Sequence, residues 1–200
     1  MKSILLSIKP KYVELIASGQ KTIEVRKTAP KEVPFKCYIY ESRNGGHRCK
    51  HCNEKDSCYS YAPKNVGCYN GRGKVIGEFI CDKVDEYPYD YCDGVDIDDD
   101  TILETAIDRE DINIYAKGKT LYGWHISDLK IYDKPRELSE FRTPCNFRNA
   151  DNSCQYEWVD CYYTKFDYNQ DSSINMAECS SYITCAPQSW MYIEDLGGKE

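Results

Sequence analysis

The feature that constrains this chain most is a short helix that ends at a glycine and leads directly into a charged strand. Val13, Ile16 and Ala17 recur at helical spacing after Pro10, which suits a first helical turn, and Gly19 can adopt the left-handed conformation that ends a helix. The residues that follow the glycine alternate between polar and apolar types. Because successive side chains of a strand point to opposite faces, this pattern predicts one apolar and one polar face.

The polar face of this strand carries residue types that bind ligands. Thr22, Glu24 and Arg26 share that face, and Lys21 lies where the strand begins. These residues by themselves fit a solvated strand surface with an ion pair equally well. The spacing Gly-x-Lys-x-x-Glu-x-Arg alone therefore does not distinguish a binding site from a solvated surface.

This spacing resembles the signature of the ASCH domain, a branch of the PUA-like barrel superfamily. Three later stretches are similar to that family and follow in its order: 73–79 (GKVIGEF), 122–126 (YGWHI) and 187–193 (PQSWMYI). The resemblance implies an α+β fold, namely a small mixed or antiparallel β-barrel with flanking helices. We therefore expect a single domain over residues 1–200, with two irregular cysteine-rich insertions at about 43–73 and 142–187.

The resemblance also implies a function, because members of this family are thought to hold RNA or nucleotides in a cleft between barrel and helix. We expect Lys21 and Arg26 to contact phosphate or base acceptors. Glu24 would accept a hydrogen bond from a base amino group or orient Lys21, and Thr22 would add a hydroxyl.

Two later strands supply aromatic candidates for the same cleft. Tyr40 alternates with apolar residues in a strand expected at 37–42, so it can face either the cleft or the outside of the barrel. Trp124 and His125 point to opposite faces of a strand expected at 121–132, so at most one of them lines the cleft. Trp124 would stack on a base, whereas His125 would act as an acid or base near neutral pH. Packing in the core is the alternative for both.

An enzyme is the second hypothesis. Some proteins of this family resemble amidohydrolases that act on N4-acylated cytidines, and others have been proposed as ribonucleases. The amidohydrolase branch places a lysine, a threonine and a separate glutamate in the cleft. Here Lys21 is kept, but Glu24 occupies the threonine position, so a threonine nucleophile is not indicated. Lys21 and Glu24 can still perform general acid-base chemistry if burial shifts their pKa values.

The charge of the chain is unevenly distributed along the sequence. The formal net charge is -7, yet residues 1–74 hold 15 Lys or Arg and 6 Asp or Glu, a net +9. Residues 75–200 hold the remaining 11 and 27, a net -16. A basic first part that contains the motif indicates a localised anion-binding face rather than a general nucleic-acid coat.

The chain has twelve cysteines and no convincing signal peptide, because the apolar stretch 4–8 is short and contains a serine. No apolar run approaches the ~18 residues that would cross a membrane, so we expect a cytoplasmic protein that does not contact the membrane. Cytoplasmic thiols stay reduced, which makes metal binding or burial their expected role rather than disulfide formation.

The first cysteine-rich insertion predicts a structural zinc site. The expected ligands are Cys49, Cys52, Cys58 and Cys68, and His47 or His51 can replace one of them. Free thiols in an open loop, or disulfides in an oxidising setting, are the alternatives. The second insertion carries Cys145, Cys154, Cys161, Cys179 and Cys185, a wider set that could hold zinc or an iron-sulfur cluster or share one site with the first. No catalytic cofactor is expected. A metal-stabilised interaction protein, in which these insertions form the working surface, is the third hypothesis.

An acidic stretch at residues 93–100 precedes a predicted helix. Its order does not match an EF-hand calcium loop, so we expect the carboxylates to favour the helix N-terminus. Thr101 and Glu104 have the spacing of a capping box. The helix is expected to break near Asp111 and to end by Gly118.

Overall fold

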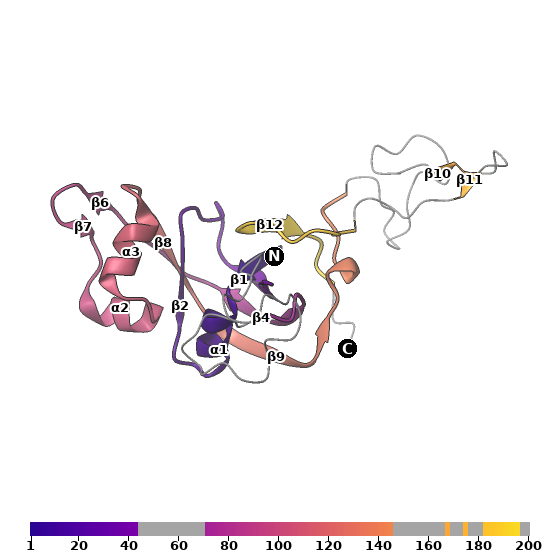
Figure 1. The fold of residues 1–200 in the computed structure, drawn as a ribbon, viewed down its shortest axis with the longest axis horizontal. Helices are drawn as coiled ribbons and strands as arrows, with labels where there is room; N and C mark the ends of the chain where they lie inside the picture. The colour runs from indigo at the N-terminus through magenta and orange to yellow at the C-terminus, as the bar shows by residue number, and fades with distance from the viewer. Residues whose placement is uncertain (44–70, 146–166, 169–173, 176–181, 197–200) are drawn as a thin grey trace, which may run out of the picture.

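Two β-sheets and three α-helices make up the described part of the chain in the computed structural model, which comprises residues 1–43, 71–145, 167–168, 174–175 and 182–196 (Figure 1). The larger sheet has the strand order β12-β1-β3-β4-β9, and the smaller sheet has the order β2-β8-β5. Their strands are β1 (Lys2–Ile8), β2 (Ile23–Arg26), β3 (Phe35–Glu41), β4 (Val75–Cys81), β5 (Val84–Tyr87), β8 (Leu121–His125), β9 (Ser127–Arg136) and β12 (Trp190–Ile193). Two short ladders pair β6 (Tyr89–Asp90) with β7 (Gly94–Val95) and β10 (Asp167–Tyr168) with β11 (Ile174–Asn175). The helices are α1 (Pro10–Ala17), α2 (Asp99–Thr105), α3 (Arg109–Ala116) and the short 3-10 helix η1 (Leu138–Glu140). The α+β class is confirmed.

The strand pairing differs from the closed barrel that the family resemblance implies. β1 pairs parallel with β3, and the other neighbours in the larger sheet are antiparallel. Within the described residues no ladder joins β9 to β12 or connects the two sheets. The segment 121–132, expected as one strand, is divided between the two sheets as β8 and β9, and the apolar segment 73–84 is likewise divided between β4 and β5. Since strand propensity continues across each break, the local sequence pattern does not reveal the change of sheet.

The alternation of side chains predicts β3 correctly and β4 incorrectly. Cys37 and Ile39 pack in the cluster beneath α1, whereas Tyr40 packs on the opposite face of the larger sheet. In a regular strand Val75 and Phe79, four residues apart, share one face, but in β4 they lie in different clusters. The register between β4 and its neighbours shifts next to Val75, and such a bulge reverses the phase of the alternation.

The helix α1 confirms the prediction made from its sequence. It begins at Pro10, buries Val13 and Ile16, and is followed by Gly19 at φ +74°. This conformation ends the helix and turns the chain toward β2, as a glycine permits. The expected placement of Lys21, just before the strand, is also observed.

Residues 89–118 form a helical lobe that contains β6, β7, α2 and α3. Figure 1 shows this lobe at the left end of the molecule, with β2 and β8 between it and the larger sheet. Asp98 caps α2, since its carboxylate accepts a hydrogen bond from the Thr101 amide, so the expected Thr101-Glu104 capping box is wrong. The helical segment breaks at Ala106, in the left-handed region, and not near Asp111. The expected placement of carboxylates at a helix N-terminus is confirmed by Asp99 and Asp100.

Most of the cysteines proposed as metal ligands lie outside the described residues. These are the whole first set (Cys49, Cys52, Cys58 and Cys68, with His47 and His51) and Cys154, Cys161 and Cys179 of the second. Cys145 and Cys185 are described and carry free thiols. In the described ranges, no cluster of three or more His, Cys, Asp or Glu could hold a metal ion. The zinc site therefore stays a prediction. None of the described helices is long and apolar enough to span a membrane.

Candidate functional site

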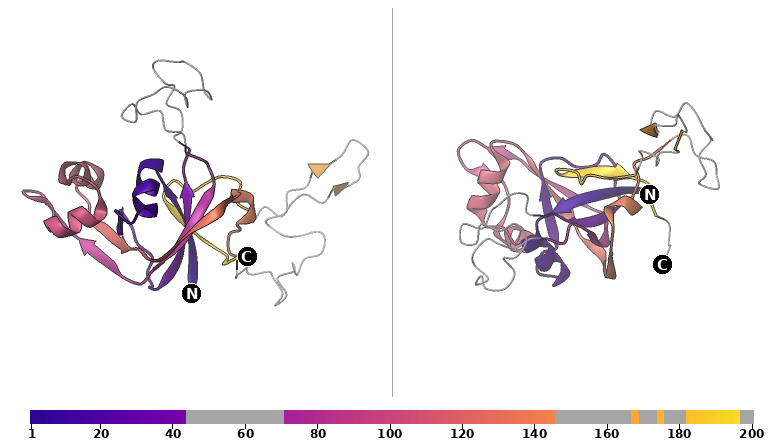
Figure 2. Two further views of the ribbon diagram at one scale, coloured as in Figure 1. Left: turned by 90° about the horizontal axis from the view of Figure 1, so that it is seen from below. Right: turned by 45° about the vertical axis from the view of Figure 1, so that its right-hand side comes forward.

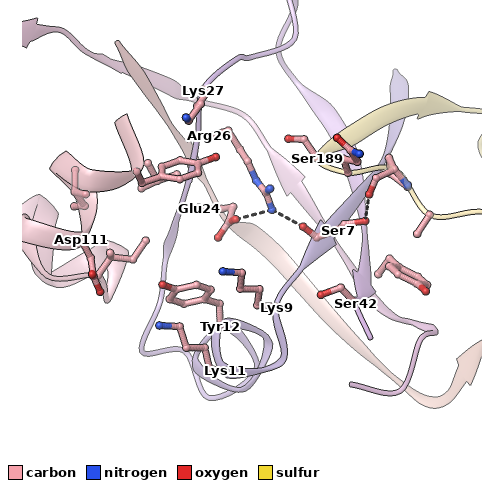
Figure 3. A pocket seen from close by; sticks show the side chains of 18 of the residues that line it. Ser7, Lys9, Lys11, Tyr12, Glu24, Arg26, Lys27, Ser42, Asp111 and Ser189 are labelled. Atoms are coloured by element: carbon pink, nitrogen blue, oxygen red, sulfur yellow. Dashed lines mark hydrogen bonds and ion pairs between the residues drawn. The ribbon is translucent and has the colours of Figure 1, made fainter. Parts of the chain in front are cut away.

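A cavity of about 930 Å³ lies between α1, the motif strand β2 and the helical lobe (Figure 3). In the left view of Figure 2, α1 lies between the lobe and the larger sheet. β2 supplies residues 24–26 of the lining, α3 supplies Asp111, Ile112, Ile114 and Tyr115, and residues 185–189 close another side. The motif strand thus lies at the meeting point of the cavity walls.

The lining of this cavity is basic although the whole chain is acidic. Six bases line it, against the two carboxylates of Glu24 and Asp111: Lys9, Lys11, Arg26, Lys27, Arg43 and Lys117. All but Lys117 come from residues 9–43, so the basic first part of the sequence does contribute most of the cations of the cavity. A concave surface with this excess of cations attracts anionic ligands.

Arg26 and Glu24 form a fixed pair in the cavity wall. The Arg26 Nη2 donates a hydrogen bond of 2.7 Å to the Ser7 carbonyl and lies 2.8 Å from Glu24 Oε1 (Figure 3). The Nε group of Arg26 is buried and has no hydrogen-bond partner among the described residues. The pair thus places a fixed guanidinium and a fixed carboxylate in the cavity wall.

Lys21 lies behind this pair and does not line the cavity. Its Nζ donates hydrogen bonds to the carbonyls of Ile23, at 2.8 Å, and Thr105, at 2.6 Å, and lies 3.3 Å from Glu24 Oε2. Two of its three N–H donors are thus used by backbone carbonyls, and Glu24 Oε2 lies at ion-pair distance without a hydrogen bond of its own among the described residues. Burial lowers the pKa of Lys21, and the Glu24 carboxylate opposes that shift.

The position of Lys21 explains how the lobe is attached to the motif strand. Thr105 is the last residue of α2, and its carbonyl is one of those that an α-helix leaves without an internal partner. Lys21 supplies a charged donor to it, and the Thr22 amide donates to the neighbouring Glu104 carbonyl at 2.9 Å. The motif lysine therefore ties α2, and through it the α3 wall, to β2.

Of the other predicted ligand-binding residues, Tyr40 lies at the cavity, whereas Thr22 and Trp124 do not. The Thr22 side chain is exposed. Trp124 is fully buried, with ring centroids 5.1 Å from Phe35 and 5.8 Å from Trp190, so it has no face available to a base. It follows the core-packing alternative, because β8 lies between β2 and β5 and turns this side chain inward.

His125 also lies away from the cavity. Its Nε2 is 2.6 Å from Asp85 Oδ2 on the adjacent strand β5, and neither residue lines the cavity. Trp124 and His125 do point to opposite faces, as the alternation predicts. The acid-base role considered for His125 in the cleft has no geometric support.

Two aromatic residues of the cavity are not among the candidates selected from the sequence. Tyr12 on α1 lies under two lysines, with Lys11 Nζ 4.5 Å and Lys21 Nζ 5.3 Å from its ring centroid. Tyr115 on α3 has Lys27 Nζ 4.9 Å from its ring centroid. The pattern Lys-Pro-Lys-Tyr at residues 9–12 could have indicated Tyr12, because it places an aromatic ring among lysines. Nothing near Tyr115 in the sequence connects that residue with β2.

The comparison with protein families agrees with this geometry. Residues 6–88 match the model of the ASCH domain family. The matched span contains α1, β2 and the basic wall of the cavity, and it stops before the helical lobe at residues 89–118.

Similar solved structures come from one protein of Zymomonas mobilis. They are the structure of ASCH, at 17% identity over 68% of this chain and 74% of that one, and a variant of it with a tyrosine replaced by phenylalanine, at 16% identity over 69% and 77%. A second variant, with a serine replaced by alanine, matches at 17% identity over 68% of this chain and 75% of that one. The TM-score is 0.44 in all three cases. No curated protein matches the chain.

Proposed function

We propose that the cavity binds RNA or a nucleotide. The observation that carries this proposal is the concentration of six bases against two carboxylates in the lining of a cavity within a chain of net charge -7. Phosphate groups are the anions that such a set of Lys and Arg side chains recognises best, since each base contributes charge-assisted hydrogen bonds. The match of residues 6–88 to the ASCH family supports the same assignment.

The residues of the cavity divide into contacts of two kinds. Lys9, Lys11 and Lys27 contribute charge toward phosphate oxygens, and their side chains can adapt to the ligand. Tyr12 and Tyr115 offer aromatic faces, and stacking of a base on such a ring is worth about 1–3 kcal/mol. These contacts replace the roles that the sequence suggested for Thr22 and Trp124.

Glu24 and Arg26 act as a preorganised pair in this scheme. Each already has a protein partner, so neither side chain needs to be ordered when the ligand binds. Glu24 accepts a hydrogen bond from a base amino group, and Arg26 donates a hydrogen bond to an acceptor on a base or a phosphate. Lys21 acts behind them, by holding Glu24 and the lobe, rather than by touching the ligand.

The geometry argues against a catalytic role for Lys21 at the ligand. Its Nζ lies outside the cavity lining and donates to the carbonyls of Ile23 and Thr105, so it does not reach a ligand in the cavity. A general base or nucleophile would have to be unprotonated and to reach the ligand.

Measurement of RNA and nucleotide binding to the wild-type protein and a triple variant tests the proposal. The variant carries Lys9→Ala, Lys11→Ala and Lys27→Ala, and the matched control carries Lys31→Ala, Lys130→Ala and Lys134→Ala, which are exposed and outside the cavity. The probes are the four ribonucleoside 5′-monophosphates and a fluorescent 12-nucleotide single strand of mixed sequence. We expect the affinity of the cavity variant to fall about tenfold or more at low salt. The slope of the logarithm of its binding constant against the logarithm of the salt concentration should become less negative by about 0.7 for each phosphate that the variant no longer binds. Equal decreases in both variants, or no binding to the wild type, would refute the cavity as the site.

A further inference from the structure

We infer that the cavity takes a single phosphorylated ribonucleotide unit, free or at the end of a single strand, and that the helical lobe excludes the interior of a long RNA. This inference rests on the proposed function and specifies its ligand. The evidence is the contrast in charge between the two sides of the cavity and the size of the cavity.

The helical lobe is the most acidic surface that borders the cavity. Residues 89–118 contain ten Asp or Glu and two Lys or Arg, and all ten carboxylates are exposed. They follow one another around both helices and the β6-β7 turn: Asp90, Asp93, Asp96, Asp98, Asp99, Asp100, Glu104, Asp108, Glu110 and Asp111. The lobe therefore carries a net charge of -8 next to a basic cavity.

The position of the lobe makes this charge relevant to the ligand. Its helix α3 is itself a wall of the cavity, through Ile112, Ile114 and Tyr115. This part of the lobe contributes one acid, Asp111 (Figure 3), and one base, Lys117, to the lining, and the other nine acids of the lobe lie beyond it. A helix of eight residues is only about 12 Å long, and charges are screened over about 8 Å at physiological salt. Phosphates of a strand that crossed this wall would lie within the field of the lobe.

The bases of the cavity can neutralise only a few phosphates. Lys9, Lys11, Arg26, Lys27 and Arg43 come from residues 9–43, and they line a volume of about 930 Å³. This volume lies within the range of small-molecule sites, about 300–1,000 Å³. Aromatic rings from both walls, Tyr12 and Tyr115, complete an environment for one base with its ribose and phosphate.

Competition between ligands of different length tests the inference on the full chain. The probes are the four ribonucleoside 5′-monophosphates, a 20-nucleotide single strand with and without a 5′-phosphate, and a 20-base-pair RNA duplex. We expect the single strand to bind no more than about threefold tighter than the best monophosphate, and the duplex at least about tenfold weaker. The salt slope of the single strand should be near -1.4, the value for about two phosphates at 0.7 each.

A charge-neutralised lobe provides the decisive variant. Its four substitutions, at exposed acids of the lobe, are Asp93→Asn, Asp96→Asn, Glu104→Gln and Glu110→Gln. The matched control removes four exposed acids that do not line the cavity: Glu32→Gln, Asp82→Asn, Asp128→Asn and Asp133→Asn. We expect the lobe variant to bind the single strand about tenfold tighter than the wild type does, with less than about a threefold change for the monophosphates, and the control to show neither effect.

The outcomes separate this inference from the function on which it rests. Wild-type affinity that rises steeply with RNA length, or a lobe variant that equals the control, overturns the inference while leaving nucleic-acid binding intact. Absence of binding to every probe refutes the proposed function itself. A 5′-phosphorylated strand that competes as well as the monophosphate identifies strand ends as ligands, and one that competes at least tenfold more weakly identifies the free nucleotide.

Discussion

The two ends of β2 place the two bases of the motif in opposite environments. The Lys21 side chain is 0% exposed and is held by three protein oxygens, whereas Arg26, at 10% exposure, lines the cavity. Glu24 lies between them and pairs with both. One motif therefore combines a buried end, which holds the helical lobe, with an end that lines the cavity proposed to bind the ligand.

The strongest test of this contrast removes the buried charge. Lys21→Met keeps an unbranched side chain of similar length but leaves the Thr105 carbonyl without its charged donor and Glu24 with Arg26 as its remaining ion-pair partner. Breaking a buried ion pair from one side costs about 3–5 kcal/mol, so we expect a decrease of that size in the free energy of unfolding measured with urea. Amide hydrogen exchange in α2 should also accelerate, because Lys21 ties that helix to β2.

The exposed Lys11 provides the control for this measurement. Lys11→Met removes a base of the cavity wall, and we expect it to change the free energy of unfolding by less than about 0.5 kcal/mol. If Lys21→Met also cost less than about 1 kcal/mol, the structural role assigned to the buried end would be wrong.

A smaller effect is expected where the two ends meet. Glu24→Gln keeps the shape of the side chain but leaves the charges of Lys21 and Arg26 buried without a carboxylate between them. We expect a decrease of about 2–3 kcal/mol in unfolding free energy, together with weaker binding of the nucleotide probes. The exposed Glu14→Gln on α1 is the matched control.

A double variant sharpens this second prediction. Lys21→Met with Glu24→Gln should cost less than the sum of the single changes, since residues in contact show coupling of about 0.5–3 kcal/mol. Additive effects would mean that the two side chains act independently, and the joint role of the pair would have to be abandoned.

The mildest prediction concerns the attachment of the lobe to the smaller sheet. Burial, together with the carboxylates of Asp85, Asp98 and Glu104, raises the pKa of Tyr87 from 10.0 to about 12. Its hydroxyl is buried without a hydrogen-bond partner in the described part of the chain, so Tyr87→Phe should change stability at pH 7 by less than about 1 kcal/mol.

The pH dependence of the Tyr87→Phe variant follows from the direction of that shift. Since the folded-state pKa is the higher one, the tyrosine contributes stability that is present below pH 10 and lost as pH rises through about 12. The unfolding free energy of the variant should therefore fall less steeply than that of the wild type between these values, by less than about 2.7 kcal/mol in total. Parallel curves for the two proteins would contradict the assignment.

The candidate site was predictable in part, and the reason differs from residue to residue. Arg26 and Glu24 were expected at the ligand and do line the cavity, because they share the polar face of a strand next to α1. Lys21 was expected beside them but is buried, since the acceptor that holds it, Thr105, lies 84 residues away. Trp124 was a stacking candidate because its residue type suits stacking, yet its strand runs through the interior of the smaller sheet.

Local sequence was sufficient to specify the features that depend on neighbouring residues. These include α1 with its left-handed Gly19, and the alternation of Cys37, Ile39 and Tyr40 between the two faces of β3. Helix termination and strand alternation arise from backbone geometry over a few residues, so the pattern alone contains the information.

Long-range pairing was needed for everything that creates the cavity. The breaks between β4 and β5 and between β8 and β9 carry the chain from one sheet to the other. The helix α3 becomes a wall because Ile112 and Ala116 pack in one cluster with Val25 of β2, and because Lys21 and Thr22 hold α2 against β2. Such contacts join segments about 80 residues apart, as between Thr22 and Glu104, and depend on which surfaces remain free once the core is packed. For that reason the contrast between a basic and an acidic segment is present in the sequence as two compositions, but only the folded chain brings the two segments together around one cavity.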